Sequence, residues 1–238
     1  MVSYIWEDTH IMEKNPNLIV MLTHHDRTVP NAAEVFEACR SSRAQYWGFK
    51  EVGLPPDQMK ALFSAMRARG KTTVLEVVAY TEAACLRGAA IAAECGCDIL
   101  MGTVFYDSVN AFCKSANLRY MPFVGTISGR PSVLEGSVEE MIAQAREYLQ
   151  KGVSGIDLLA YRYTGDPAEL IRTFVRSVDA PVCLAGSIDS FSRLDEVRRS
   201  GAWGFTIGGA FFEHQFGEDF SSQIDTVCAY MEKIPSAV

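Results

Sequence analysis

The sequence predicts an α/β fold: a single (β/α)₈ barrel, or TIM barrel, that spans residues 1–238 as one domain. Short apolar runs alternate with amphipathic helical segments from residue 18 onward, and eight such strand–helix units follow one another. Strands that alternate with helices pair in parallel, and the 238 residues suit a barrel, which needs roughly 250. The alternative is an open doubly wound sheet, whose first turn is usually rich in glycine. The first turn here, THHDRTVPN, has none, which favours the barrel.

The first four units are marked by strand-like runs and by residues typical of helix ends. Asn31 and Glu34 form a capping pair before the first helix. Pro56 is suited to open the second helix and Gly70 to end it. Asp107 is placed to cap the helix that follows the fourth run. The four predicted strands comprise residues 18–23, 45–51, 72–79 and 98–105.

The last four units carry similar signals. Ser137 and Glu140 form a capping box after the fifth loop, TISGRPSVLEG, which is the longest in the chain. Asp166 and Pro167 begin the sixth helix, and Gly201 ends the seventh. A last amphipathic helix is expected over residues 221–234, and residues 1–17 are expected to cover the bottom of the barrel. The predicted strands comprise residues 120–125, 155–161, 181–185 and 204–207.

Composition limits the partners and the compartment. A net charge of −7 gives no general attraction to nucleic acid or to an anionic membrane. No apolar run approaches the ~18 residues of a membrane span. The odd number of cysteines, seven at scattered positions, argues against a disulfide framework and indicates free thiols in a reducing compartment. We therefore expect a cytoplasmic protein with neither nucleic-acid nor membrane partners, and we leave a homo-oligomer open.

A bipartite motif near the C-terminus predicts an anion site. Residues 185–190 (AGSIDS) and 206–213 (TIGGAFFE) each form a strand end with small residues that lead into a helix. Glycine lets backbone N–H groups approach a ligand closely, and a helix N-terminus presents unpaired N–H donors. Two such ends side by side form a phosphate cup, which barrels often place after strands seven and eight. The predicted phosphate-binding residues are Gly186, Ser187, Gly208 and Gly209.

Residues 185–213 (AGSIDSFSRLDEVRRSGAWGFTIGGAFFE) resemble the phosphate-gripping quarter of the ribulose-phosphate-binding barrels. That superfamily includes the histidine-biosynthesis sugar isomerase, phosphoribosylanthranilate isomerase and N-acetylmannosamine-6-phosphate epimerase. The resemblance implies a phosphorylated small-molecule substrate bound by backbone near the four residues of the cup. The other strands match only in order and length. The paired aspartates of the histidine-pathway isomerase, the D-x-K-x-x-D pattern of orotidine-phosphate-type decarboxylases and the metal set of the pentose-phosphate 3-epimerase are missing, so the reaction is not implied.

Charged residues inside apolar strand runs point to the chemistry. Lys50 in WGFKEVG and Glu76 in VLEVVA lie on adjacent predicted strands, where they would meet at the barrel mouth as an ion pair. A desolvated lysine serves as a proton shuttle or forms a Schiff base, and a partly buried glutamate serves as a general base. Asp157 lies inside the sixth strand and is either a partner of this pair or a core carboxylate. Asp26 follows the first strand and is either catalytic or a brace of the first loop.

Three further residues are candidates for binding the substrate. Arg130, in the long fifth loop, suits a second anionic group such as a carboxylate. His24 ends the first strand, and Tyr161 is placed to wall a sugar-sized pocket. Adjacent strand residues point to opposite sides, so His24 and His25 are not expected to bind one metal ion together. We predict no metal and no cofactor.

These residues support three functions. The first is an isomerase or epimerase that moves a proton on a phosphorylated, sugar-like substrate with Lys50 and a carboxylate. The second is a lyase, either an aldolase or a decarboxylase, in which Lys50 forms a Schiff base or faces a carbanion. The third is a non-enzymatic sensor of phosphorylated metabolites that resembles the glycerol-3-phosphate-responsive antiterminator. A net charge of −7 and the lack of a basic stripe weigh against an RNA-binding sensor.

Overall fold

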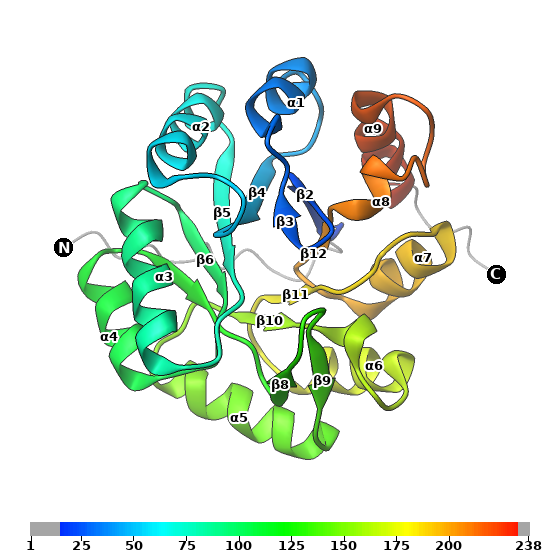
Figure 1. Cartoon of the computed structure of the whole chain (residues 1–238). Coiled ribbons are helices and arrows are strands. Elements are labelled where there is room, and N and C mark those ends of the chain that lie inside the picture. The colour runs from blue at the N-terminus through cyan, green and yellow to red at the C-terminus, as the bar shows by residue number, and fades with distance from the viewer. Residues whose placement is uncertain (1–14, 233–238) are drawn as a thin grey trace.

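Eight parallel strands form one curled sheet in the computed structural model, which describes residues 15–232 (Figure 1). Hydrogen-bonded neighbours follow the order β10-β11-β12-β1-β4-β5-β6-β7. The helices surround this sheet, as the predicted (β/α)₈ class requires (Figure 1). The strands are β1 (Asn17–Met21), β4 (Tyr46–Lys50), β5 (Thr72–Val77), β6 (Ile99–Gly102), β7 (Arg119–Met121), β10 (Ile156–Leu158), β11 (Val182–Leu184) and β12 (Gly204–Ile207).

Backbone hydrogen bonds close the barrel between its two end strands, β7 and β10. Phe123 and Asp157 form a parallel bridge just beyond β7. The amide of Asp157 donates to the carbonyl of Pro122 at 3.0 Å, and the amide of Ser154 donates to the carbonyl of Tyr120 at 2.8 Å. Because the end strands are joined in this way, the barrel prediction is confirmed and the open-sheet alternative is excluded.

The helices begin and end at several of the predicted residues. Ser137 and Glu140 make the expected capping box, and the Asp166 side chain accepts from two backbone amides at the start of α6. Gly201 ends α7 with a φ of 77°, which glycine adopts without strain. The helices are α1 (Ala32–Cys39), α2 (Pro56–Ala68), α3 (Glu82–Glu94), α4 (Asp107–Ser115), α5 (Val138–Gln150), α6 (Pro167–Ser177), α7 (Phe191–Ser200), α8 (Gly209–Phe212) and α9 (Phe220–Met231).

Some helix ends differ from the prediction. Asn31 precedes α1 but its side chain makes no capping hydrogen bond, and Asp107 is the first residue of α4 instead of its cap. The last helix ends at Met231, three residues before the expected end. Residues 1–14, most of the segment expected to cover the barrel bottom, lie outside the described part of the chain, as do residues 233–238.

Side chains alternate between two cores along each strand. Ile19, Val74, Met101 and Cys183 belong to a small cluster inside the barrel, whereas their strand neighbours, such as Leu75, belong to the large cluster beneath the helices. Since side chains two apart share a face, the same alternation directs Lys50, Glu76 and Asp157 into the barrel. All seven cysteines are free, as expected, and six of them are buried.

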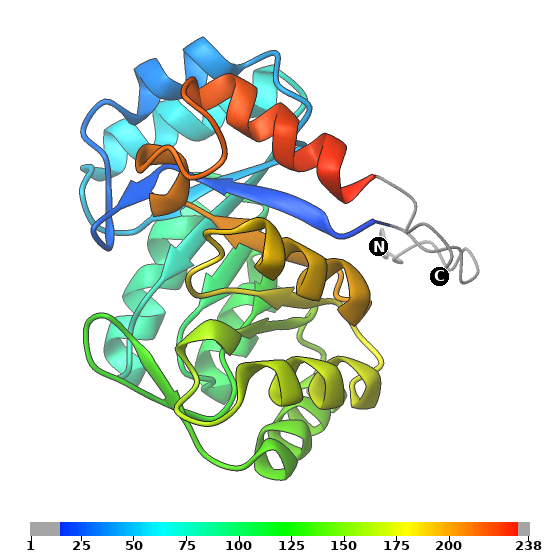
Figure 2. The same cartoon turned by 90° about the vertical axis from the view of Figure 1, so that its right-hand side faces the viewer.

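Four short elements crowd one end of the barrel, and of these the sequence predicted only the helix into which residues 206–213 lead, α8. Two are hairpins, which lie at the same end of the barrel in Figure 2. They occur because the loops after β1 and β7 pair with themselves before the next helix begins. This end holds the carboxyl ends of the strands, where (β/α)₈ enzymes place their sites. The elements are β2–β3 (Thr23–His24 and Arg27–Thr28), β8–β9 (Thr126–Ser128 and Val133–Glu135), the 3₁₀ turn η1 (Ala160–Arg162) and α8.

Candidate functional site

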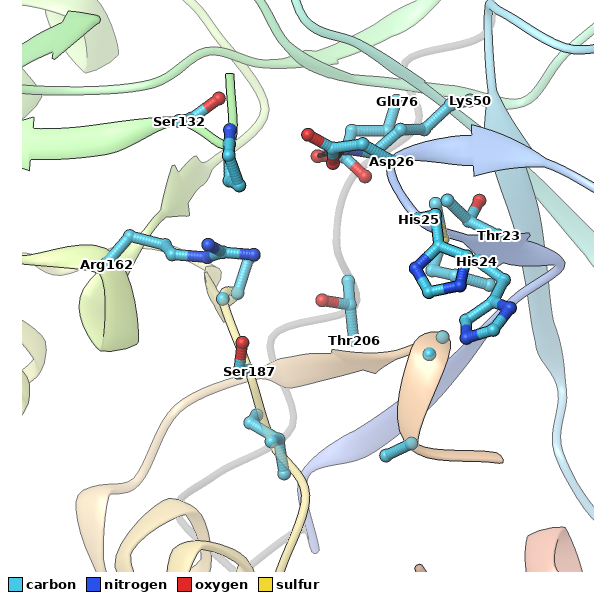
Figure 3. A pocket seen from close by; sticks show the side chains of 18 of the residues that line it. Thr23, His24, His25, Asp26, Lys50, Glu76, Ser132, Arg162, Ser187 and Thr206 are labelled. Atoms are coloured by element: carbon cyan, nitrogen blue, oxygen red, sulfur yellow. Dashed lines mark hydrogen bonds and ion pairs between the residues drawn. The ribbon is translucent and has the colours of Figure 1, made fainter. Parts of the chain in front are cut away.

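A cavity of about 650 Å³ opens at the carboxyl end of the barrel. Its lining comes from β4 and β5 and from the segments at the ends of β1, β7, β10, β11 and β12. The charged side chains project into it from several sides in Figure 3. Of the residues predicted from sequence, it brings together Asp26, Lys50, Glu76, His24, Arg130, Gly186, Ser187, Gly208 and Gly209.

The hairpin β2–β3 carries Asp26 over the cavity in an unusual backbone conformation. Its two central residues, His25 and Asp26, have φ values of 49° and 62°. Two-residue hairpin loops of this kind prefer Asn-Gly because positive φ costs most other residues free energy, on the order of 1–3 kcal/mol each. Thr28 anchors the hairpin, since its hydroxyl donates to the carbonyl of Lys50 at 2.7 Å and accepts from the Lys50 amide at 3.0 Å. The strained turn is thus held against the strand that carries Lys50.

Lys50 lies between two carboxylates at the floor of the cavity (Figure 3). Its Nζ atom donates to Asp26 Oδ1 at 2.5 Å and lies 3.6 Å from Glu76 Oε1. The residue is only 9% exposed. Burial alone would lower the pKa of Lys50, but the charge of Glu76 and the hydrogen bond with Asp26 raise it above its usual value. Lys50 is therefore an ammonium ion at neutral pH, and its predicted pairing with Glu76 is present.

The cationic side chains of the site lower the pKa of Asp26. Burial tends to raise its pKa, but the hydrogen bond with Lys50 and the positive charges of Lys50, Arg162 and Arg130 lower it below the usual value. Asp26 consequently stays ionised well into the acid range. Two of these cations, Arg162 and Arg130, line the same cavity.

Asp157 lies beneath the cavity, inside the barrel. It is 1% exposed, and neither of its carboxyl oxygens has a hydrogen-bond partner within residues 15–232. Burial raises the pKa of Asp157 well above its usual value, Glu76 raises it further, and Lys50 opposes the shift. These effects favour the neutral, protonated form of Asp157. Asp157 is not among the residues that line the cavity.

The two glycine segments of the bipartite motif follow neighbouring strands, β11 and β12, and both line the cavity. Gly186 has a φ of 119°, and a Cβ there would lie 2.9 Å from Tyr161 Cβ. A Cβ at Gly208 would lie 2.8 Å from the carbonyl oxygen of Thr23. Packing therefore requires glycine at both positions. At Gly209 a Cβ would make only ordinary contacts, 3.6 Å from Glu213 Oε1 and 3.7 Å from a carbon of His24, so packing alone leaves this glycine unexplained.

Two acidic side chains at this cup have cationic or imidazole partners. Asp189 pairs with Arg193 at 3.0 Å. Glu213 Oε1 lies 3.4 Å from His24 Nε2. His24 also stacks on His25, with ring centroids 3.7 Å apart. The two histidines were expected to point to opposite sides, and that expectation was wrong because His25 sits in the turn and not in a strand.

Of two predicted substrate-binding residues, Arg130 and Tyr161, the first lines the cavity and the second does not. Arg130 lines the cavity and donates to the carbonyl of Val78 at 2.7 Å. Tyr161 does not line it: the Tyr161 hydroxyl donates to Glu196 at 3.0 Å and its ring lies under Arg193. The reason is that the chain after β10 turns as η1 and loses strand alternation, so that Arg162 lines the cavity instead.

Other lining residues were missed by the sequence reasoning. Arg162 stands in the strand-end triplet Tyr-Arg-Tyr, but the turn that directs it inward leaves no clear pattern in the sequence. Thr206 and Glu213 lie within the bipartite motif, where the glycines are the stronger signal. Within residues 15–232, no group of three or more His, Cys, Asp or Glu side chains could hold a metal ion. The same part of the chain has no helix long and apolar enough to cross a membrane.

Solved structures with the same fold share little sequence with this chain. N-acetylmannosamine-6-phosphate 2-epimerase from Clostridium perfringens is 14% identical, with a TM-score of 0.61, over 82% of this chain and 86% of that one. Orotidine 5′-phosphate decarboxylase from Pyrococcus horikoshii is 11% identical, with a TM-score of 0.69, over 91% and 100%. A glycerol uptake operon antiterminator regulatory protein from Listeria monocytogenes is 16% identical, with a TM-score of 0.55, over 82% and 93%.

The likeness to these proteins is one of fold. No family model matches the sequence, and no curated protein matches it. The (β/α)₈ architecture predicted from the eight strand–helix units is shared with the epimerase and the decarboxylase. One fold supports many chemistries, so function has to be argued from the site.

Replacing Asp157 with asparagine tests whether this carboxyl is protonated in the folded barrel. The unfolded chain ionises Asp157 near pH 3.8, whereas the folded protein keeps it neutral to a higher pH. Folding then takes up a proton, so the stability contribution is full below the unfolded pKa. It falls as pH rises toward the folded pKa, by up to about 1.4 kcal/mol per pH unit. An asparagine amide cannot ionise, so the unfolding free energy of Asp157→Asn minus that of the wild type should increase with pH.

Urea denaturation between about pH 5 and about pH 8 measures this difference. A buried amide without partners lowers the unfolding free energy by the same amount at every pH. The readout is therefore the change with pH of the difference between variant and wild type, and not the size of that difference at one pH. Asp179→Asn, in an exposed loop, is the control and should run parallel to the wild type. A parallel profile for Asp157→Asn as well would contradict the assignment.

Proposed function

We propose that this protein is an enzyme that transfers a proton on a small phosphorylated metabolite, as an isomerase or epimerase of sugar-phosphate-like substrates. One observation carries the proposal: an ammonium ion held between two carboxylates faces the same cavity as a glycine-lined cup. The resemblance of residues 185–213 to the ribulose-phosphate-binding barrels supports a phosphate in that cup. The epimerase of similar fold acts, by its name, on a phosphorylated sugar.

The cup would hold the phosphate through backbone N–H groups near Gly186–Ser187 and Gly208–Gly209. Both segments lead into helices, α7 and α8, whose first amides lack partners within the helix. The open space at Gly209 lets the ligand approach the backbone. Binding energy from the phosphate then orients the reacting end of the substrate over Lys50.

The reacting end would meet one base and one cation. A carboxylate, Glu76 or Asp26, removes a proton from the carbon next to a carbonyl, and the electron pair moves onto the carbonyl oxygen as an enolate. The Lys50 ammonium stabilises that oxygen as negative charge develops. Return of a proton to the opposite face of the same carbon gives an epimer. If that carbon carries a hydroxyl, return of a proton to the former carbonyl carbon gives an isomer, because the enolate oxygen takes up a proton and the hydroxyl loses its own to become the new carbonyl. No cofactor takes part in these steps.

The raised pKa of Lys50 bears on the lyase alternative. A Schiff base needs a neutral amine, and Glu76 and Asp26 stabilise the ammonium form of Lys50. A decarboxylase that uses the lysine as a cation would share the geometry proposed here. Borohydride trapping with substrate present should therefore leave Lys50 unmodified, whereas an aldolase with a Schiff base would gain the mass of the reduced adduct.

The sensor alternative has a fold-level precedent in the antiterminator regulatory protein. The net charge of −7 disfavours RNA binding, and filter binding at low salt tests it directly. We expect no retained RNA. A homo-oligomer and a cytoplasmic location remain expectations from the sequence.

Gly209→Ala tests the phosphate cup. The added methyl group fits the unliganded protein but occupies the space where the phosphate approaches the backbone. We expect affinity for sn-glycerol 3-phosphate to fall about tenfold or more, with the melting temperature of the free protein changed little. Calorimetric titration measures the affinity. Arg172→Ala, on the exposed face of α6, is the control and should bind the probe as the wild type does. Equal affinities of wild type and Gly209→Ala would remove Gly209 from the cup.

Lys50→Met tests the proton-transfer centre. A panel of phosphorylated aldehydes and ketones incubated in D₂O shows exchange at carbon by nuclear magnetic resonance. We expect the exchange seen with the wild type to fall by about 10²–10⁴-fold in the variant. Binding of glycerol 3-phosphate should stay within about threefold, because the cup lies on other strands.

A second variant separates loss of proton transfer from loss of folding. Lys50→Arg keeps a positive charge between Asp26 and Glu76 and so avoids leaving the two carboxylates uncompensated. Its guanidinium cannot pass a proton but still supplies positive charge to the enolate, so the exchange rate should fall less than in Lys50→Met. If both variants are folded and Lys50→Met keeps the full exchange rate, Lys50 does not stabilise the enolate.

A further inference from the structure

We propose that the substrate carries a second anionic group, a carboxylate, at the end remote from its phosphate, and that Arg162 binds it. This inference rests on the proposed function, because it takes the phosphate to lie in the cup formed by residues 185–189 and 206–210. It names the substrate class more narrowly: a phosphate monoester of a small carboxylic acid.

The guanidinium of Arg162 projects from η1 into the cavity (Figure 3). The residue is half-buried, yet its side chain makes no hydrogen bond and no ion pair with any residue in the range 15–232. Its positive charge acts across the cavity on Asp26, whose pKa it helps to lower. A partly desolvated guanidinium with its donors unused is costly, and an anionic ligand would satisfy it.

Arg162 differs in this respect from the other charged groups of the cavity. Lys50 is paired with its two carboxylates, and Arg130 donates one of its five N–H groups to the carbonyl of Val78. Asp189 is paired with Arg193. Arg162, by contrast, has no hydrogen-bond or ion-pair partner among the described residues, so its whole guanidinium fork remains for a ligand. The guanidinium fork matches the two oxygens of a carboxylate, which a lysine in the same place would not do.

The backbone of Arg162 lies beside one half of the cup, and its side chain extends away from there. β10 and β11 are neighbours, and Tyr161, the residue before Arg162, packs against Gly186. From this position the Arg162 side chain reaches toward Asp26, on the side where the hairpin β8–β9 brings Arg130 (Figure 3). Figure 3 places Arg162 opposite the histidines of the hairpin β2–β3, with Ser187 and Thr206 on a third side. A substrate with its phosphate in the cup would thus extend its other end between Arg162 and Lys50.

Charge balance favours a carboxylate over a second phosphate. The lining already contains the carboxylates of Asp26, Glu76, Asp189 and Glu213. One arginine can neutralise a monoanion, whereas a second phosphate dianion would leave negative charge uncompensated in a partly desolvated site.

A matched pair of probes tests the inference. sn-Glycerol 3-phosphate and 3-phosphoglycerate have the same phosphate and the same central hydroxyl, and differ in a hydroxymethyl group against a carboxylate. Calorimetric titration should show that the wild type binds 3-phosphoglycerate about tenfold or more tightly than glycerol 3-phosphate, as expected for charge-assisted hydrogen bonds. Arg162→Gln should reduce this preference to about threefold or less and leave the affinity for glycerol 3-phosphate nearly unchanged. Arg172→Gln, on the exposed face of α6, should keep the preference of the wild type.

Each other outcome overturns the inference in a recognisable way. Equal weakening of both probes in Arg162→Gln would place the arginine at the phosphate itself. A preference that survives in Arg162→Gln, or that the wild type lacks, would exclude a carboxylate site at Arg162. If neither probe binds the wild type, or Gly209→Ala leaves both affinities intact, the phosphate cup fails and the proposed function fails with it.

Discussion

A buried ammonium ion organises the mouth of this barrel. Lys50 is 9% exposed, and a charge so placed requires opposite charges close by, because leaving it uncompensated costs several kcal/mol. Glu76 meets this requirement from the adjacent strand, and Asp26 meets it from a hairpin whose two central residues adopt positive φ. The strain in that turn persists because Thr28 ties the hairpin to the backbone of Lys50. The hairpin β2–β3 and the strands β4 and β5 together hold the Lys50 ammonium between two carboxylates, where it faces an open cavity.

The same arrangement divides the carboxyl groups by environment. Asp26, beside Lys50 and within reach of two arginines, has a lowered pKa, whereas Asp157, deeper and without hydrogen-bond partners among the described residues, has a strongly raised one. Carboxyl groups whose pKa values are pushed apart are typical of sites that transfer protons. Of these two carboxyl groups Asp26 lines the cavity and Asp157 does not, so the proposed isomerase or epimerase has an ionised carboxylate beside Lys50.

Periodicity and residue type predicted the barrel and much of its mouth. Apolar runs separated by helix caps specify strands and helices locally. Side chains two apart on a strand share a face, so the sequence also indicates which side chains enter the barrel. The pairing of Lys50 with Glu76 could therefore be anticipated. Loop geometry could not be anticipated. The stacking of His24 on His25, the outward packing of Tyr161 and the inward placement of Arg162 follow from a two-residue hairpin loop and a 3₁₀ turn. Such turns depend on tertiary contacts, here with Lys50 and with the helix that follows β11, and not on a local repeat.

The proposed function requires one cavity to hold the phosphate at the cup and the reacting carbon at Lys50. A crystal structure of the protein with sn-glycerol 3-phosphate bound tests this claim most directly. We expect phosphate oxygens within hydrogen-bond distance of backbone amides at Gly186–Ser187 and Gly208–Gly209, and a glycerol carbon chain that points toward Lys50 Nζ. A phosphate found elsewhere, or a carbon chain directed out of the barrel away from Lys50, would contradict it.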